Sequence, residues 1–106
     1  MQKVIRTSNR GAGKLVRDRR LFKGSNIFSE YRDGVYAVYS YGYHFPMYVW
    51  VDAEEKWYGN CDRYSITTTI HQSRCHPYTD VDWYETRDLE QLIMEKRAEA
   101  REVMVL

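Results

Sequence analysis

The densest group of side chains that could do chemistry lies in RYSITTTIHQSRCHPY, residues 63–78. With the nearby Cys61, it offers two thiols and two imidazoles: Cys61, His71, Cys75 and His76. Four such ligands can hold zinc tetrahedrally. The segment has neither the C-x2-C nor the H-x3-5-H spacing of familiar zinc sites. We therefore expect no metal and no other cofactor, although the sequence leaves open whether the four side chains converge.

Nucleophilic catalysis would need a serine or cysteine beside a histidine base and a third group that orients the base. Ser73 with His71 is a candidate pair, and Asp62, Asp80 or Asp82 could orient the base. The spacing does not connect these residues, and the chain has no G-x-S-x-G motif. We therefore expect a protein that is not an enzyme.

The sequence GAGK at 11–14 suggests a phosphate-binding loop. The complete motif needs an earlier glycine and a serine or threonine after the lysine, but these positions hold Ser8 and Leu15. We reject nucleotide hydrolysis on this ground.

Recognition is the remaining use of the polar segment. Residues 63–70 are rich in β-branched residues and are predicted to form a strand with hydroxyls on one face. The resulting polar ledge would comprise Ser65, Thr67, Thr69, His71, Gln72, Ser73 and Arg74. It could hold phosphates or a protein backbone. Alternatively, the hydroxyls only cap turns and the next element.

Charge is unevenly distributed along the chain. Residues 1–24 hold eight basic residues and one acidic residue, a net charge of +7, and the other 82 residues hold 8 basic and 14 acidic residues, a net charge of −6. Such a basic segment could dock on its own acidic domain, on a phosphate backbone or on an acidic partner. The candidate phosphate contacts are Lys14, Arg17, Arg19, Arg20 and Lys23, and the candidates for stacking on unpaired bases are Tyr41, Tyr43 and Trp57.

The length of 106 residues fits one domain, residues 1–106, with residues 1–12 as a flexible basic arm. No apolar run approaches the roughly 18 residues of a membrane span, and the N-terminus lacks the apolar stretch of a secretion signal. We expect a protein of the host-cell cytoplasm, in which Cys61 and Cys75 are free thiols.

Three further segments predict an antiparallel sheet: 35–41, which should be central because both of its faces are apolar, 47–52 and 56–59. A short helix is expected within 13–22. Thr86 is predicted to cap an amphipathic helix of about 15 to 18 residues that begins near Arg87. The predicted fold is α+β: an antiparallel sheet of three to five strands, a C-terminal amphipathic helix packed on it and a short N-terminal helix.

Several of these segments resemble a small family of phage and mobile-element proteins of unknown function. The resemblance rests on YAVYSYGYHFPMYVW, on KWYGNCDRYSITTTIHQS and on the following HP, and covers roughly residues 10–77. In the family pattern, YSYG-HFP is followed by YS-TT-HQ, and here Ile70 separates the threonines from His71. The family brings no established activity and no catalytic residues.

The resemblance implies a viral or plasmid-borne accessory protein. In that setting we expect a binding protein that inhibits a host defence protein, such as a CRISPR–Cas effector. The alternative is direct binding of nucleic acid through the basic segment and exposed aromatic residues.

Overall fold

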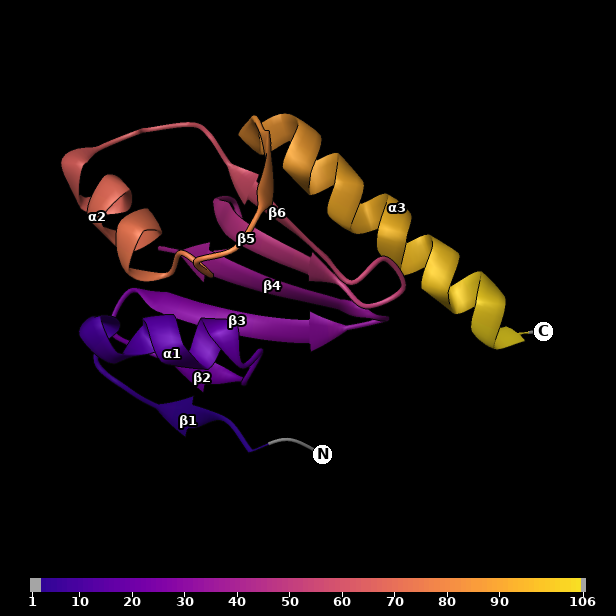
Figure 1. The fold of residues 1–106 in the computed structure, drawn as a ribbon, viewed down its shortest axis with the longest axis horizontal. Helices are drawn as coiled ribbons and strands as arrows, with labels where there is room; N and C mark the ends of the chain where they lie inside the picture. The colour runs from indigo at the N-terminus through magenta and orange to yellow at the C-terminus, as the bar shows by residue number, and fades with distance from the viewer. Residues whose placement is uncertain (1–2, 106) are drawn as a thin grey trace.

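The structure, a computed structural model, describes residues 3–105 and confirms an α+β fold (Figure 1). One sheet contains its strands in chain order: β1 (Ile5–Arg6), β2 (Phe22–Lys23), β3 (Ile27–Arg32), β4 (Val35–Ser40), β5 (Pro46–Val51), β6 (Lys56–Asn60) and β7 (Val81–Tyr84). The helices are η1 (Asn9–Gly11), α1 (Ala12–Arg17), α2 (Ile66–Arg74) and α3 (Thr86–Val105).

The seven-stranded sheet is mixed, so the prediction of three to five antiparallel strands is wrong. Strands β2 to β6 are antiparallel neighbours, whereas β1 pairs with β2 and β6 pairs with β7 in parallel. A parallel pair needs a long crossover. Helix α1 lies in the first crossover and α2 in the second, so each edge of the sheet is a β-α-β unit.

Strand β4 is central, as predicted. Its six residues are all buried, because helices cover both faces of the sheet. Tyr36 and Val38 join a core with α1 and the end of α2, and Val35, Ala37 and Tyr39 join a second core with α3. The sheet therefore separates α1 and α2 from α3.

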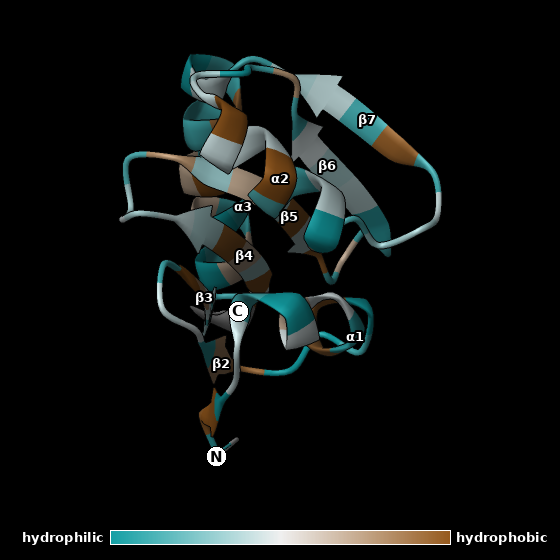
Figure 2. Cartoon of the chain, turned by 90° about the vertical axis from the view of Figure 1, so that its left-hand side faces the viewer, coloured by the Kyte–Doolittle hydropathy of each residue, from teal (hydrophilic) through white to brown (hydrophobic). Residues whose placement is uncertain are grey.

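The prediction of a strand at 63–70 is wrong, because Ser65 starts helix α2 instead. The Ser65 hydroxyl accepts a hydrogen bond from Thr68 N–H, and the Thr68 hydroxyl accepts one from Ser65 N–H, which forms a capping box. This local pairing outweighs the strand preference of the threonines. Ile66 and Ile70 are 83% and 44% exposed, and Figure 2 shows hydrophobic bands on α2 turned toward the viewer.

The basic arm predicted at 1–12 contains secondary structure in its described part. Ile5 pairs with Phe22 in the parallel ladder, and η1 and the start of α1 follow directly. Residues 1–2 lie outside the described part. The short helix expected within 13–22 spans Ala12–Arg17, and Arg19 then has a positive φ of 51°, which ends the helical conformation.

Helix α3 is longer than predicted, at 20 residues, and packs on the sheet with Leu89, Leu92 and Ile93. Thr86 is its first residue rather than its cap: Glu85 C=O accepts the hydrogen bond from Leu89 N–H. Asp62 supplies the capping carboxylate, which accepts hydrogen bonds from Thr86 N–H and Oγ1 at 2.8 and 2.6 Å. Within residues 3–105, no helix is long and apolar enough to cross a membrane.

Candidate nucleic-acid interface

The basic residues at 14–23 keep their charge uncompensated in the folded chain. Lys14, Arg17, Arg19 and Arg20 lie on α1 and the turn after it, and Lys23 lies in β2; all five side chains are exposed. We call residues 14–23 the basic segment. Throughout residues 3–105, the ion pairs use later cations: Lys56, Lys96, Arg97 and Arg101. Within the described residues, the basic segment therefore makes no ion pair with the acidic part of its own chain.

Two arginines of the basic segment are held over aromatic rings. The guanidinium carbon of Arg17 lies 5.1 Å from the centroid of the Tyr78 ring, and that of Arg19 lies 4.2 Å from a Trp50 ring. Cation–π contact restrains a guanidinium while its N–H edges stay available to an acceptor. Both cations are thus positioned before any ligand arrives.

Tyr78 begins a row of aromatic rings that runs from the basic segment to the edge strand β7. The Tyr78 and His76 rings are stacked with centroids 5.7 Å apart, and the His76 and Trp83 centroids are 5.9 Å apart. Tyr78 is 72% exposed and Trp83 is 45% exposed. We call Tyr78, His76 and Trp83 the aromatic row. Exposed rings of this kind can stack on unpaired bases.

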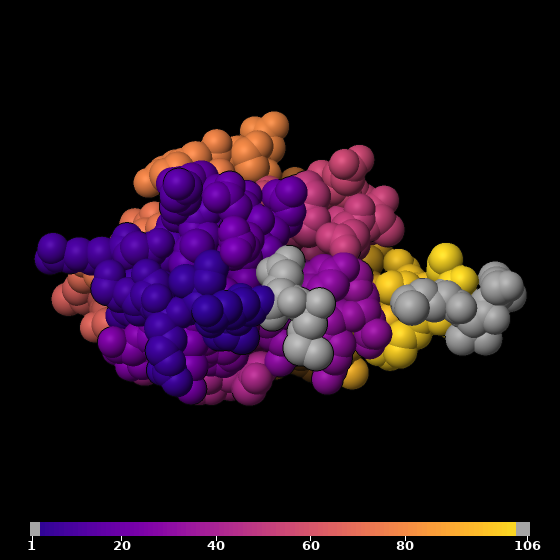
Figure 3. Space-filling model, turned by 90° about the horizontal axis from the view of Figure 1, so that it is seen from below, coloured from indigo at the N-terminus to yellow at the C-terminus, as the bar shows by residue number. Residues whose placement is uncertain are grey.

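Two glycines allow these elements to come together. A Cβ at Gly59 in β6 would lie 2.7 Å from Trp83 Cζ3, so Trp83 packs directly over the glycine. A Cβ at Gly13 in α1 would lie 2.4 Å from the Arg74 carbonyl oxygen at the end of α2. The glycine of the GAGK sequence therefore serves close packing of α1 against α2. In Figure 3, the orange surface of the residues near 80 borders the violet surface of the N-terminal region.

Of the three stacking residues predicted from the sequence, two are exposed beside Lys23 of the basic segment and one is buried. Trp57 is 4% exposed and belongs to the core, so its predicted role in base stacking is wrong. Tyr41 and Tyr43 are exposed, at 51% and 62%. Tyr41 packs on His71 and lines a shallow depression with Lys23. Tyr43 contacts Tyr39 on the α3 side of the sheet and lines a second depression with Lys23.

The predicted polar ledge is divided by α2: Ser65, Thr67, Thr69 and Ser73 are exposed, whereas His71 and Gln72 point inward. His71 and Gln72 are 3% and 2% exposed. Gln72 Nε2 donates to the carbonyls of Asn60 and Asp62 at 2.9 and 3.0 Å, and Tyr48 O–H donates to Gln72 C=O. These contacts fasten α2 to the sheet. Arg74 stays half-buried at the C-terminal end of α2.

His71 pairs with Ser40 and not with Ser73. Ser40 Oγ and His71 Nδ1 are 2.8 Å apart, and both residues are buried. Burial lowers the pKa of His71, with a further contribution from the charge of Arg74. Within residues 3–105, no carboxylate is hydrogen-bonded to His71. The pair therefore has neither the orienting acid nor the access that nucleophilic catalysis needs.

Within residues 3–105, the cysteines and histidines are not grouped as metal ligands would be. Cys61 is exposed, Cys75 is buried, and both are free thiols, as expected. Burial raises the pKa of Cys75 to about 12, so its thiol is protonated at neutral pH. Among the described residues, no three side chains of histidine, cysteine, aspartate or glutamate are arranged to hold a metal ion.

The acidic residues of α3 lie across the sheet from the basic segment. The acids on this helix are Asp88, Glu90, Glu95, Glu99 and Glu102. Because α1 and α3 pack on opposite sheet faces, the fold separates these acids from the basic segment. In comparisons with known proteins, no family model, no curated protein and no solved structure matches this chain.

Proposed function

We propose that this chain is a non-enzymatic protein that binds single-stranded nucleic acid through the basic segment and the aromatic row. The observation that carries the proposal is the contact of Arg17 with Tyr78, which joins an unpaired cation to exposed rings. Phosphates would contact Lys14, Arg17, Arg19 and Arg20, and bases would stack on Trp83 and Tyr78. The fold turns the acids of α3 away from this surface.

The test is fluorescence anisotropy with labelled DNA and RNA strands of about 15 nucleotides, with a duplex for comparison. We expect single strands to bind more tightly than the duplex. Affinity should fall steeply between about 50 and about 200 mM salt, because bound phosphates release counterions. Absent or salt-insensitive binding would rule the proposal out.

The matched variants are Lys14→Gln/Arg17→Gln and Arg87→Gln/Arg101→Gln, which remove the same charge from α1 and α3. The α1 pair should lower the slope of log affinity against log salt by about 1.4, since each contact with a single strand contributes about 0.7. The α3 pair should leave the slope unchanged. Equal effects of the two pairs would contradict the assignment of the surface.

A second candidate function is the one that the family resemblance implies: binding and inhibition of a host defence protein, such as a CRISPR–Cas effector. The exposed Ile66 and Ile70 favour it, because they lie one turn apart on α2 and could anchor in a groove of a protein partner. Tyr64, 63% exposed, precedes this helix.

A pull-down from host lysate, with and without nuclease, separates the two functions. A protein that is retained after nuclease treatment and lost with Ile66→Ser/Ile70→Ser would support inhibition. The control Val103→Ser, which changes an exposed apolar residue on α3, should retain it. A partner that disappears with nuclease would instead support direct binding of nucleic acid.

A further inference from the structure

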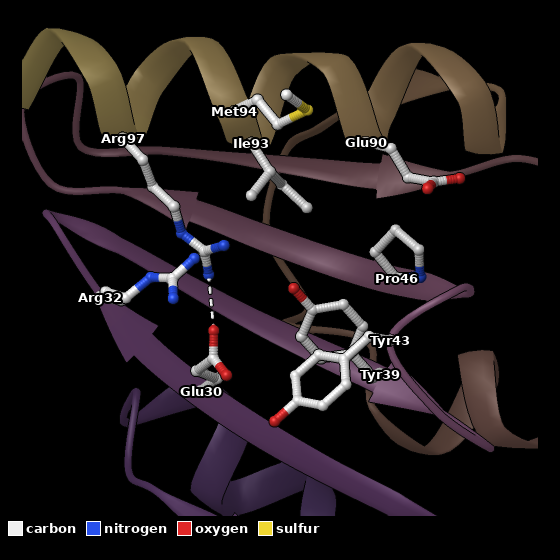
Figure 4. A pocket seen from close by; sticks show the side chains of 9 residues that line it. All are labelled: Glu30, Arg32, Tyr39, Tyr43, Pro46, Glu90, Ile93, Met94 and Arg97. Carbon is white, nitrogen blue, oxygen red and sulfur yellow. Dashed lines mark hydrogen bonds and ion pairs between the residues drawn. The ribbon is translucent and has the colours of Figure 1, made fainter.

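An open cavity of about 430 Å³ lies between α3 and the sheet, on the face opposite the basic segment. Figure 4 shows the residues that line it: Glu30, Arg32, Tyr39, Tyr43, Pro46, Glu90, Ile93, Met94 and Arg97. Its volume falls within the usual range of sites for small molecules. Neither proposed function uses this cavity.

The body of the cavity is apolar and aromatic. Ile93 and Tyr39 are both 4% exposed and form its inner wall, while Met94 and Tyr43 are 65% and 62% exposed and form its rim. The Tyr39 and Tyr43 rings meet edge to face, with centroids 5.0 Å apart, and Phe28 packs against both. This lining suits an aromatic or branched aliphatic group.

One end of the cavity carries excess positive charge. Arg97 is 8% exposed and donates from Nη2 to Glu30 Oε1 at 3.0 Å. Its Nε is buried, and no atom of the described chain accepts a hydrogen bond from it. Figure 4 shows the guanidinium of Arg32 beside that of Arg97. Since Arg32 makes no ion pair within residues 3–105, two cations face one carboxylate at this end. The second carboxylate of the cavity, that of Glu90, lies near Pro46 at the other end.

This arrangement is incomplete without an anion. A buried N–H donor without an acceptor is costly, and so are two guanidinium groups side by side with one counter-charge. A ligand carboxylate would supply the one negative charge that Arg32, Arg97 and Glu30 together lack. The two oxygens of a carboxylate also match the fork of N–H donors on a guanidinium. The exposed side chain of Arg32 can turn to admit it without losing a partner.

We propose that this cavity binds a small organic carboxylate with an aromatic or branched aliphatic body. The carboxylate lies against Arg32 and Arg97, and the body lies on Tyr43, Ile93 and Met94. Glu30 already pairs with Arg97 and interacts with the Tyr43 phenol, so it holds the cationic end in place.

The test uses the full chain and three probes: phenylacetate, indole-3-acetate and 4-methylpentanoate, each compared with its neutral amide. Titrations followed by backbone amide NMR shifts should show saturable binding with a Kd below about 1 mM for at least one carboxylate. The shifts should map to β3, the β4–β5 turn and α3. The matching amide should bind at least about tenfold more weakly, because it has no negative charge and only one oxygen to accept from the guanidinium fork.

Two variants test the geometry without touching the core. Arg32→Gln should weaken binding by about tenfold, and Met94→Asp, on the exposed rim, should abolish it by repulsion. Arg101→Gln removes a cation from the same helix outside the cavity and should have no effect. The proposal is overturned if no carboxylate saturates below about 1 mM, if the amides bind equally well, if the shifts map to α1, or if Arg32→Gln binds normally.

Discussion

Thr86 lies at the centre of a hydrogen-bond network that joins the sheet to α3. Its hydroxyl donates to Asp62 and accepts from Asn60 Nδ2 at 2.9 Å and from Tyr64 O–H at 3.1 Å. Asn60 Nδ2 also donates to Pro46 C=O. The hydrogen bonds from Thr86 hold the pKa of Asp62 below its usual value. Individual side chains at the ends of β5 and β6 thus set where α3 begins.

His71 makes the stability of the fold depend on pH. Its folded-state pKa is below the ordinary value, chiefly because the ring is buried. The unfolded chain therefore binds the proton more readily, and stability that is present above about pH 6.5 falls as the pH drops below it. We expect urea unfolding to show a loss of stability from about pH 7.5 to about pH 5.5.

The matched variant for His71 is His71→Asn, which keeps a polar group near the position of Nδ1 but does not titrate. It should show a smaller loss of stability over the same pH range. His44→Asn, at an exposed histidine, should behave like the natural sequence. An unchanged pH dependence in His71→Asn would show that another group is responsible.

At the scale of elements, the sequence predicted those parts of the fold that local pattern determines. The β-branched and aromatic residues of 35–41 identify β4, and the apolar spacing after Thr86 identifies α3. Segment 63–70 was misassigned, because its threonines favour strands while Ser65 and Thr68 form a capping box that favours a helix. The same error prevents prediction of the parallel pairing of β6 with β7, since α2 is the crossover between these strands.

The two-residue strands and the aromatic row could not be predicted from local pattern. Strands β1 and β2 exist because α1 brings two distant segments into parallel register. Arg17 meets Tyr78 only because α1 and α2 pack on the same sheet face. The sequence did identify the basic residues of the candidate interface, but their aromatic neighbours Trp50 and Tyr78 lie more than 25 residues further along the chain.

The contact of α1 with α2 depends on a glycine, which gives a prediction at this scale. In Gly13→Ala, the new Cβ would meet the Arg74 carbonyl oxygen, so α1 must shift. We expect a loss of about 1 to 3 kcal/mol in unfolding free energy, measured by urea denaturation. Affinity for single-stranded nucleic acid should also fall, because Arg17 moves relative to Tyr78. The control is Lys14→Ala, at the next position, which is exposed and should leave the unfolding free energy nearly unchanged. If Gly13→Ala were as stable as the natural sequence, the close packing of α1 against α2 would be contradicted.

At the scale of the whole molecule, the basic segment and the acids of α3 lie on opposite sides of the sheet. The molecule measures 43 × 30 × 24 Å, and α1 and α3 lie on either side of the strands (Figure 1). At about 0.15 M salt, charges interact over about 8 Å, and at about 0.01 M over about 30 Å. The acids of α3 should therefore influence ligands of the basic segment only when salt is low.

This separation gives a prediction for Glu95→Gln/Glu102→Gln, which removes two exposed acids from α3. At about 0.15 M salt, affinity for a single-stranded oligonucleotide should stay within about twofold, whereas at about 0.01 M it should rise, because repulsion then reaches across the molecule. The matched variant Asp18→Asn/Asp80→Asn removes two exposed acids close in sequence to Arg17 and Tyr78 and should strengthen binding at both salt concentrations.

Anisotropy titrations measure the affinity of both variants at each salt concentration. If the α3 variant strengthens binding at about 0.15 M as much as its counterpart does, the nucleic acid lies near α3, and the basic segment is not the principal contact surface.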